Sequence, residues 1–414
     1  MAKPPGLIKI NYSLLVSYPK LVAAYHSCRQ HKQHSVNALI FKNQLFKNLA
    51  TLRQNLKNYQ YFPTKSICFA VSYPKLREIF AADFKDRVVH HLLVNQLEPR
   101  FEKQFVFHSF ACRKYKGGHV AANYLSHFLQ QLTKNFSQPG FYQQLDISNF
   151  FARIDKPTLN TILKQHIQRY YNCEPVKQKQ LLWLTKIIIN HDPTSNYHLN
   201  GSEQLHAKVP KHKSLFNQPK SKGLPIGNLT SQFFANVYLN QLDQFCKRQL
   251  KIKYYLRYAD DVVMLSQDKQ QLQYWQENIK EFLQAKLKLK LNPTKTKLAS
   301  IYQGVDFVGY LVKPHRIYVR NKTVKQVKTI LYNFNQGMLW VHNHQRQEAV
   351  ALKAKPTSEQ IKYLQAALNS YYGHFRQADS LNLRKHLFHQ HFGTLKKYLK
   401  PVNNYQHFVI KKLQ

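Results

Sequence analysis

The stretch Ile252–Leu265, IKYYLRYADDVVML, places two adjacent carboxylates, Asp260 and Asp261, inside a run that is otherwise rich in aromatic and aliphatic residues. Removing a carboxylate from water is costly unless a cation or hydrogen bonds compensate for the lost hydration. Neighbouring side chains of a strand point to opposite faces, so both carboxylates can reach one cation only at the tip of a hairpin. The apolar runs on both sides of the pair therefore predict a β-hairpin whose acidic tip lies beside a positive group.

A second strand-like run, residues 141–151 (FYQQLDISNFF), carries Asp146 near its end. Three carboxylates from two strands form an all-oxygen donor set that suits Mg²⁺. Such a set can hold two ions roughly 3.5 to 4 Å apart, the arrangement with which polymerases activate a 3′-hydroxyl and stabilise the leaving pyrophosphate. The alternative for Tyr258–Asp261 alone is a surface hairpin with a solvated acidic tip. Asp146 and the segments described below favour a catalytic site.

The chain is strongly basic and its acids are unevenly placed. Its 414 residues include 62 Lys and Arg against 20 Asp and Glu, a formal net charge of +42. A field of this sign attracts polyanions, above all nucleic acids. No acid occurs before Glu78 or between Lys103 and Leu145. A general bias toward lysine would explain part of the charge, but it would not place carboxylates on two apolar strands.

The length and the cysteine pattern bound the class of protein. A chain of 414 residues that is 43% hydrophobic can form two or three domains with a sizeable core. Five widely spaced cysteines without a CxxC pair indicate neither a zinc site nor a disulfide framework. No cleavable leader and no run of about 18 apolar residues is visible. We therefore expect a cytoplasmic protein with no membrane association.

Periodicity and composition divide the chain into four parts, residues 1–62, 63–140, 141–312 and 313–414, of which the first is basic and helical and the last is helical. Residues 190–222 are polar and loop-like, and they indicate a basic insertion that could contact nucleic acid.

Several positive segments are candidates for phosphate contacts. Lys75 and Arg77 follow a predicted turn, where two cations could reach a triphosphate, the arginine as a bidentate fork. As an isolated pair they could equally be solvated surface charges. The loop at residues 107–119 (FHSFACRKYKGGH) is basic and contains glycines, so its backbone could approach a phosphate backbone or a template strand closely. In the segment NPTKTK (292–297), Lys295 could donate a proton to pyrophosphate.

Two aromatic residues follow Asp146. An aromatic side chain five residues after a metal-binding aspartate can lie under the sugar of an incoming nucleotide and exclude a 2′-hydroxyl, which would select deoxynucleotides. An ordinary core position is the better interpretation for Phe150, and on spacing alone it is about as good for Phe151.

The ordered set of motifs resembles the reverse transcriptases of bacteria, and among them those of diversity-generating retroelements most closely, with defence-associated bacterial reverse transcriptases second. The resemblance runs from about residue 70 to 390. KLREIFAADFKDRVVHHLLVNQLEP and HSFACRKYKGGH match fingers motifs, QLDISNFF and YADD match palm motifs, NPTKTK and GVDFVGY match the lysine-bearing motif and the primer grip, and NSYYGHFRQADS matches the thumb.

The resemblance implies an α+β right-hand polymerase: helical fingers over residues 63–140 after the N-terminal extension, a palm built on an antiparallel sheet over 141–312, and a helical thumb and tail over 313–414. It also implies roles for named residues. Metal ligation falls to Asp146 with the adjacent Ile147, Asp260 and Asp261; catalysis to these aspartates and Lys295; nucleotide binding to Lys75, Arg77, Phe151, Ile226 and Gly227; and nucleic-acid binding to Arg113, Lys114, Lys116, Tyr258, Gly309, His374 and Arg376.

The segment GLPIGNLTSQ (223–232) is the basis for the resemblance to the diversity-generating subgroup. Most reverse transcriptases have a glutamine where Ile226 stands beside the nucleotide, and an aliphatic residue followed by Gly-Asn and Ser-Gln is typical of the diversity-generating group. Because buried hydrogen bonds enforce large specificity ratios, losing this polar contact is expected to relax discrimination.

The sequence therefore predicts an RNA-directed DNA polymerase that uses dNTPs and two Mg²⁺ ions, for which Mn²⁺ can substitute, and that makes DNA on an RNA template. A dedicated noncoding RNA is the expected template in either biological context, diversification or antiviral defence. The need for an accessory protein or a homo-oligomer is left open. The rival hypotheses are a non-catalytic RNA-binding scaffold and an RNA polymerase on the same palm; Phe151 disfavours the second.

Overall fold

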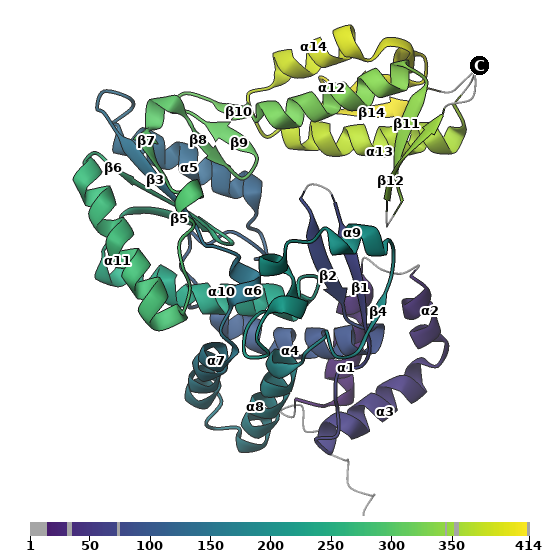
Figure 1. Cartoon of the computed structure of the whole chain (residues 1–414), viewed down its shortest axis with the longest axis vertical. Helices are drawn as coiled ribbons and strands as arrows, with labels where there is room; N and C mark the ends of the chain where they lie inside the picture. The colour runs from purple at the N-terminus through teal and green to yellow at the C-terminus, as the bar shows by residue number, and fades with distance from the viewer. Residues whose placement is uncertain (1–14, 31–34, 73–74, 344–345, 352–355, 412–414) are drawn as a thin grey trace, which may run out of the picture. The chain divides into compact units, whose positions relative to one another are not determined.

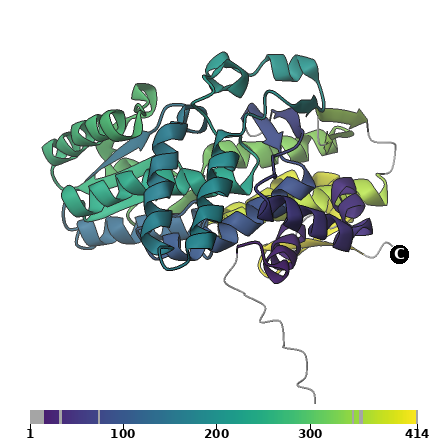
Figure 2. The ribbon, with the colours of Figure 1, turned by 90° about the horizontal axis from the view of Figure 1, so that it is seen from below.

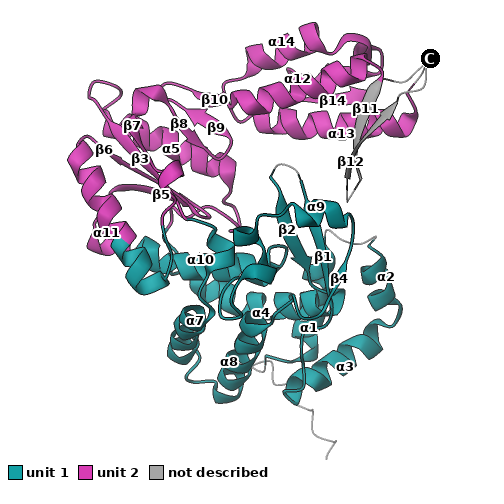
Figure 3. Cartoon of the chain, viewed as in Figure 1, with its two compact units in different colours: residues 1–106, 148–244, 281–290 teal, residues 107–147, 245–280, 291–414 magenta. Residues whose placement is uncertain are grey.

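The computed structural model describes residues 15–30, 35–72, 75–343, 346–351 and 356–411 (Figure 1). Parts of the predicted N-terminal helical extension, residues 1–14 and 31–34, lie outside the described residues, as does the turn at 73–74. The chain forms two compact units, each built from segments far apart in sequence (Figure 3). Unit 1 comprises residues 1–106, 148–244 and 281–290, and unit 2 comprises residues 107–147, 245–280 and 291–414.

Unit 1 is mainly helical. Its elements are α1 (Tyr18–Arg29), α2 (Val36–Asn43), α3 (Leu45–Lys57), β1 (Ser66–Val71), β2 (Arg77–Ala81), α4 (Phe84–Glu102), α6 (Phe150–Arg153), α7 (Lys156–Tyr170), α8 (Pro175–Asn190), β4 (Tyr197–Leu199), α9 (Glu203–Ala207), the 3₁₀ turns η1 (Lys211–Lys213) and η2 (Leu215–Asn217), and α10 (Leu229–Gln244).

Helix α4 lies at the centre of unit 1. Asp83 caps its N-terminus by accepting a hydrogen bond from the Lys85 amide at 2.9 Å, as aspartate commonly does at this position. The helix packs against α1 and α10, and its apolar residues are buried on several sides. Helices α7 and α8 lie side by side in the same unit (Figure 2).

The small sheet of unit 1 has the order β2-β1-β4, with β1 and β2 antiparallel and β1 and β4 parallel. Strand β4 belongs to residues 190–222, which we predicted to be loop-like, and the segment also contains α9 and two 3₁₀ turns. That prediction was wrong because the three-residue strand depends on backbone pairing with β1, for example from the Asn200 amide to the Cys68 carbonyl at 2.8 Å. A strand this short carries no periodicity in the sequence.

Unit 2 contains two sheets in its first half. Its elements there are α5 (Gly118–Leu132), β3 (Phe141–Asp146), the π-helical turn η3 (Phe245–Gln249), β5 (Tyr254–Tyr258), β6 (Asp261–Ser266), α11 (Lys269–Leu287, whose last residues belong to unit 1), η4 (Pro293–Lys295), β7 (Lys297–Ser300), η5 (Ile301–Gln303), β8 (Val305–Phe307), β9 (Tyr310–Val312) and β10 (Ile317–Val319).

The larger sheet has the order β5-β6-β3-β7 and is antiparallel throughout. Helix α5 covers it, since Ala122, Leu125 and Leu129 share one buried cluster with Tyr142 and Val263 of the sheet. The second sheet, β10-β9-β8, contributes to the same cluster. This core fixes the strands whose ends carry the aspartates.

The second half of unit 2 has its own core. It consists of α12 (Asn321–Asn335), β11 (Met338–Asn343), β12 (Arg346–Ala351), α13 (Ser358–Phe375), α14 (Leu381–His391), the 3₁₀ turn η6 (Gly393–Lys397), β13 (Leu399–Val402) and β14 (His407–Ile410). The hairpins β11–β12 and β13–β14 were not predicted. Hairpin β13–β14 is held by tertiary packing, since Phe408 is buried among Tyr372 and Phe392.

Across the described part of the chain, no helix is both long and apolar enough to span a bilayer. The architecture is α+β. It contains the four-stranded antiparallel sheet expected for a palm, and the segments before and after this sheet in the sequence are predominantly helical.

Candidate active site

The run Ile252–Leu265 folds as the predicted hairpin. Strands β5 and β6 pair so that Tyr258 lies opposite Asp261, which leaves Ala259 and Asp260 as a two-residue turn. Ala259 adopts φ +53°, a left-handed conformation that is uncommon for a residue other than glycine. The turn brings Asp260 and Asp261 to the edge of the sheet.

Strand β3 brings the third carboxylate to the same edge. Asp146 is the register partner of Asp261 on the neighbouring antiparallel strand, and the Ile147 amide donates to the Asp260 carbonyl at 3.3 Å. Side chains of directly opposed residues lie on one face of a sheet, and like charges there repel each other. The pairing of Asp146 with Asp261 therefore requires a positive group.

Lys295 supplies a positive charge. Its Nζ lies 2.7 Å from Asp146 Oδ1, with 52% of the lysine side chain and 9% of the aspartate side chain exposed. Burial alone would lower the pKa of Lys295, but the hydrogen bond to Asp146 and the charges of Asp146, Asp260 and Asp261 outweigh it and raise the pKa. The ammonium is therefore fully protonated at neutral pH and interacts with all three carboxylates.

Asn292 holds the other oxygen of Asp146. Its Nδ2 donates to Asp146 Oδ2 at 3.1 Å, and its backbone amide donates to the Asp146 carbonyl at 2.8 Å. Its Oδ1 caps the turn η4 by accepting from the Thr294 amide at 3.2 Å. Asn292 thus positions both Asp146 and the turn that ends in Lys295, a role that the sequence analysis missed although the residue precedes a proline in a quoted motif.

Arg257 is a second residue that the sequence analysis missed. It is fully buried, and its guanidinium donates to the Ala259 carbonyl and to Ser109 Oγ, both at 2.9 Å. Its backbone pairs with the His108 and Phe110 main chain. The signal was an arginine inside an apolar strand, because a buried guanidinium needs partners. Arg257 holds the left-handed turn beside Asp260.

The donor set fits a divalent cation. The carboxylates of Asp146, Asp260 and Asp261 are hard oxygen donors, and the charges of all three raise the pKa of Lys295, as expected for a region that favours positive charge. Among the described residues, no three His, Cys, Asp or Glu side chains are close enough together to form a ready-made metal site. Because Lys295 Nζ lies 2.7 Å from Asp146 Oδ1, a cation that binds this oxygen must compete with the lysine.

The nucleotide-binding candidates lie in unit 1, and three of their segments are hydrogen-bonded together. The Phe80 amide of β2, the strand that begins with Arg77, donates to the Ile226 carbonyl at 2.9 Å. The Leu224 amide of the same 223–232 segment donates to the Phe151 carbonyl at 2.8 Å. Strand β2, the GLPIGN segment and the turn of α6 therefore form one connected group.

Backbone geometry at Gly227 requires a glycine. Its φ is +123°, and a Cβ there would lie 3.0 Å from the Phe80 carbonyl oxygen and 2.9 Å from Ile79 Cγ2. Asn228 fixes the segment further, since its Oδ1 accepts from the Ala82 amide at 3.0 Å. Gly227 is thereby held against β2 by contacts that leave no room for a side chain.

The remaining members of this set differ in exposure. Phe151 is half-buried, whereas Phe150 is buried and meets its ring edge-on at 5.3 Å between centroids. The core position that we favoured for Phe150 is confirmed. Lys75 and Arg77 are exposed.

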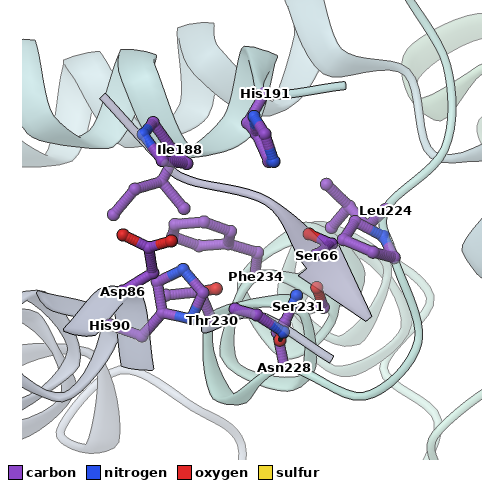
Figure 4. A pocket seen from close by; sticks show the side chains of 13 residues that line it. Ser66, Asp86, His90, Ile188, His191, Leu224, Asn228, Thr230, Ser231 and Phe234 are labelled. Carbon is purple, nitrogen blue, oxygen red and sulfur yellow. Dashed lines mark hydrogen bonds between the residues drawn. The ribbon is translucent and has the colours of Figure 1, made fainter. Parts of the chain in front are cut away.

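A small polar cavity lies behind this segment in unit 1 (Figure 4). Asp86, His90, His191 and Asn228 line it together with apolar side chains. Its space of about 20 Å³ accommodates one water molecule. Burial, reinforced by nearby positive groups, lowers the pKa of His90 to about 3, so its ring is neutral at neutral pH.

The basic loop of unit 2 is partly bound to itself. Arg113 donates to the Ser109 carbonyl at 2.7 Å, and Lys116 donates to the Phe107 carbonyl at 3.0 Å. Lys114 is exposed and lies 5.1 Å from the centre of the Tyr115 ring, which is 86% exposed. Of the three basic residues Arg113, Lys114 and Lys116, Lys114 is therefore the exposed one, and the exposed Tyr115 lies beside it.

The other nucleic-acid candidates lie on three elements of unit 2. Tyr258 ends β5 and is half-buried; burial and the nearby Cys112 raise its pKa. Gly309 is in the turn between β8 and β9, at φ +93°. His374 ends α13 and its Nε2 lies 3.4 Å from the Gly309 carbonyl, whereas the next-but-one residue, Arg376, is exposed.

Comparisons with known proteins bear on the whole set. Residues 72–312 match the family model described as reverse transcriptase (RNA-dependent DNA polymerase). Protein YkfC of Escherichia coli (strain K12) is 24% identical over 327 residues, covering 70% of this chain and 78% of that protein. Group II intron-encoded protein LtrA of Lactococcus lactis subsp. cremoris is 22% identical over 353 residues, covering 74% of this chain and 57% of LtrA.

Among solved structures, apo telomerase from Candida tropicalis, truncated from its C-terminal domain, is similar at a TM-score of 0.43 and 12% identity, covering 62% of this chain and 55% of that one. Telomerase from Candida albicans in complex with a telomeric RNA fragment gives the same score and identity, covering 82% and 58%. The family match spans more than half of the chain and contains all three aspartates and Lys295. The chain therefore belongs to the reverse transcriptase family and is an RNA-directed DNA polymerase.

Proposed function

We propose that this protein extends a 3′-hydroxyl on an RNA template with dNTPs at the site formed by Asp146, Asp260 and Asp261. The observation that supports this best is the register pair of Asp146 and Asp261 at the sheet edge, beside the Asp260 turn. Three carboxylates there would hold two Mg²⁺ ions, or Mn²⁺ in their place, with Ile147 next to the first ligand. Bound ions would activate the 3′-hydroxyl and stabilise the leaving pyrophosphate.

Lys295 has two tasks in this proposal. Its ammonium balances the carboxylates, and once displaced from Asp146 Oδ1 it can donate a proton to the leaving pyrophosphate. Asn292 keeps hold of Asp146 Oδ2 while the lysine moves, because its amide is fixed by the cap of η4.

The connected group in unit 1 is proposed to bind the nucleotide. Lys75 and Arg77 are exposed cations suited to a triphosphate, Phe151 would lie under the sugar, and Ile226 with Gly227 would line the base-pair pocket. Hydrogen bonds from β2 to Ile226 and from Leu224 to Phe151 support a shared task, because they tie these candidates together.

Nucleic acid would be bound by the basic candidates of unit 2, of which Lys114 and Arg376 are exposed. We retain fingers at 63–140, palm at 141–312 and thumb at 313–414 as a functional division. The polar insertion 190–222 packs against the strands of the proposed fingers, since Ser214 Oγ donates to Glu78 of β2 at 2.7 Å.

For the biological context we propose a diversity-generating retroelement that copies a dedicated noncoding RNA. The support is the aliphatic Ile226, half-buried in a segment that is fixed to β2, where a polar side chain would otherwise contact the nucleotide. Without that polar contact, the enzyme would discriminate less strongly between correct and incorrect nucleotides. An antiviral defence enzyme with its own RNA is the competing context. An accessory protein or a homo-oligomer is compatible with either biological context, diversification or defence.

Primer extension tests the proposal. Purified protein would receive a primed RNA template, dNTPs and Mg²⁺, and the product would be sequenced. We expect DNA from the wild type, a loss of at least about 10²-fold with Asp260→Asn, and little change with Glu277→Gln, whose carboxylate is exposed on α11 and pairs with Lys280. Errors concentrated at template adenines would support diversification, and faithful copying would favour defence.

A scaffold that only binds RNA gives a different pattern. It predicts RNA binding without Mg²⁺, no DNA on any template, including RNA copurified from the host, and the same behaviour for both variants. That pattern would contradict the proposed reaction.

A further inference from the structure

Three side chains from separate segments of unit 2 meet at one hydroxyl group. Tyr310 Oη lies 2.6 Å from His119 Nδ1 and 2.9 Å from His374 Nδ1. His119 is in the first turn of α5, Tyr310 begins β9 and His374 ends α13. The Tyr310 and His374 rings also stack, with centroids 4.2 Å apart and planes at 21°.

The Tyr310 hydroxyl also lies 3.0 Å from the His374 backbone carbonyl, but its single proton can serve only one of the two acceptors on His374. One arrangement of protons with neutral rings satisfies the contacts among the three side chains and the contact with Gly309. His374 Nε2–H donates to the Gly309 carbonyl at 3.4 Å, which leaves its Nδ1 as an acceptor for the Tyr310 hydroxyl. His119 Nδ1–H then donates to Tyr310 Oη. Burial lowers the pKa of both histidines and raises the pKa of Tyr310, so the neutral forms persist at neutral pH.

The chain of hydrogen bonds ends on a strained turn. Val308 and Gly309 join β8 to β9 with φ values of +45° and +93°. A positive φ is costly for a β-branched residue such as valine, so surrounding contacts must hold the turn. A Cβ on Gly118 would lie 3.4 Å from Val308 Cβ, so the valine packs directly on the α5 backbone.

His374 lies against the second residue of the same turn. A Cβ on Gly309 would lie 3.1 Å from His374 Cε1, and the Gly309 carbonyl also accepts from the Arg320 amide at 3.3 Å. With Nδ1 on Tyr310 and Nε2 on Gly309, the ring nitrogens of His374 are both engaged. Direct hydrogen bonding of His374 to nucleic acid, which the sequence suggested, would break one of these contacts.

We propose that His119, Tyr310 and His374 form a lock that joins the β8–β9 turn to α5 and α13 and so positions Val308 and Gly309 for the primer strand. The role of the turn in holding the primer strand rests on the proposed function, whereas the lock itself is a property of the fold. His374 is on this view a positioning residue, and exposed Arg376, one residue beyond α13, remains available for phosphate.

Tyr310→Phe tests the lock, because it removes only the hydroxyl and keeps the stacked ring. Tyr318→Phe is the matched control, since Tyr318 lies on the adjacent strand β10 and is 40% exposed. The first measurement is hydrogen–deuterium exchange of the peptide spanning residues 308–320, which includes the Arg320 amide. We expect exchange about 2- to 10-fold faster in Tyr310→Phe and unchanged in the control.

The second measurement separates positioning from folding. We expect the KM for a primer–template duplex, and its Kd measured by anisotropy in EDTA, to rise about 2- to 10-fold in Tyr310→Phe, with the KM for dNTP unchanged. Equal exchange in wild type and Tyr310→Phe would overturn the lock. Faster exchange with unaltered duplex binding and KM would overturn its role in primer positioning. A wild type that binds duplex but makes no DNA would count against the proposed function and leave the exchange result to decide the lock.

Discussion

Lys295→Met should make the protein bind Mg²⁺ more tightly while making it a slower enzyme. The ammonium lies 2.7 Å from Asp146 Oδ1, an oxygen that a metal ion at this site would need, so the lysine and the ion compete. Methionine keeps the unbranched side chain and removes the charge. The two effects have opposite signs, which distinguishes competition from general damage to the site.

The magnitude follows from the exposure of the pair. Half of the Lys295 side chain is exposed, so the ion pair contributes about 1 kcal/mol rather than the larger value of a buried pair. Removing this competition would raise the Mg²⁺ affinity about 5-fold. At an ion concentration of about ten times the wild-type Kd, the added stabilisation by Mg²⁺ would rise from about 1.4 to about 2.3 kcal/mol. For a chain of 414 residues, that difference corresponds to a Tm shift of roughly 1 °C.

Two assays and one control check this reasoning. Thermal unfolding across a Mg²⁺ titration reports affinity without catalysis, and primer extension should fall by about 10² to 10⁴ through loss of the proton donor. Lys297→Met removes the same charge two residues away, where the ammonium lies 5.5 Å from the centre of the Tyr142 ring. Equal or weaker Mg²⁺ binding by Lys295→Met, or an equal gain in the control, would refute the competition between Lys295 and the ion.

Two further predictions use unit 1. Gly227→Ala should destabilise the local backbone by about 1 to 3 kcal/mol, because φ is +123° and the new Cβ would meet the Phe80 carbonyl. The KM for dNTP should rise while duplex binding stays unchanged. An unaltered KM would count against a role of this segment in nucleotide binding. His90 has its pKa lowered from 6.5 to about 3, so the unfolded chain binds the proton first and stability falls as pH drops below about 6.5. Below about pH 6.5, the free energy of unfolding, measured by denaturant melts from pH 7 to 4, should fall by about 1.4 kcal/mol per pH unit because of this group. In His90→Leu, which cannot take up the proton, the plot of unfolding free energy against pH should be flatter by that amount. Equal slopes for the wild type and the variant would be inconsistent with a buried neutral ring.

The hairpin that carries Asp260 and Asp261 was predictable because its sequence departs from the usual exclusion of carboxylates from apolar strands. Two adjacent aspartates in an apolar run have few structural explanations, and Asp146 at the end of a second apolar run has the same property. The pairing of Asp146 with Asp261 was not predictable, because register depends on which strands become neighbours in the sheet β5-β6-β3-β7.

Residues that act through others were missed for a related reason. Asn292 is an ordinary polar residue in sequence, and although Arg257 stands out as an arginine in an apolar strand, only the folded chain shows the first on Asp146 and the second, fully buried, on the Ala259 carbonyl. His374 was assigned to nucleic acid from its motif, and its contacts with Gly309 and Tyr310 could not be read from a helical segment alone.

The carboxylates of this basic chain divide by the kind of donor that holds them. Asp86 accepts from the Tyr61 hydroxyl and from the Thr64 amide and hydroxyl at 2.6 to 2.9 Å, and Glu78 accepts from Ser214 and the Leu215 amide. These partners are hydroxyl groups and backbone amides of residues 61–64 and 214–215, and Glu78 also lies 3.3 Å from His206 Nε2, so the two buried acids anchor those segments. Asp146 instead accepts from an ammonium on a half-exposed side chain and from one amide side chain. An ammonium can be exchanged for another cation without unfolding the chain, whereas a backbone amide cannot, and this difference in donors is why we propose Asp146, rather than the buried Asp86 or Glu78, as the carboxylate that takes up a metal ion.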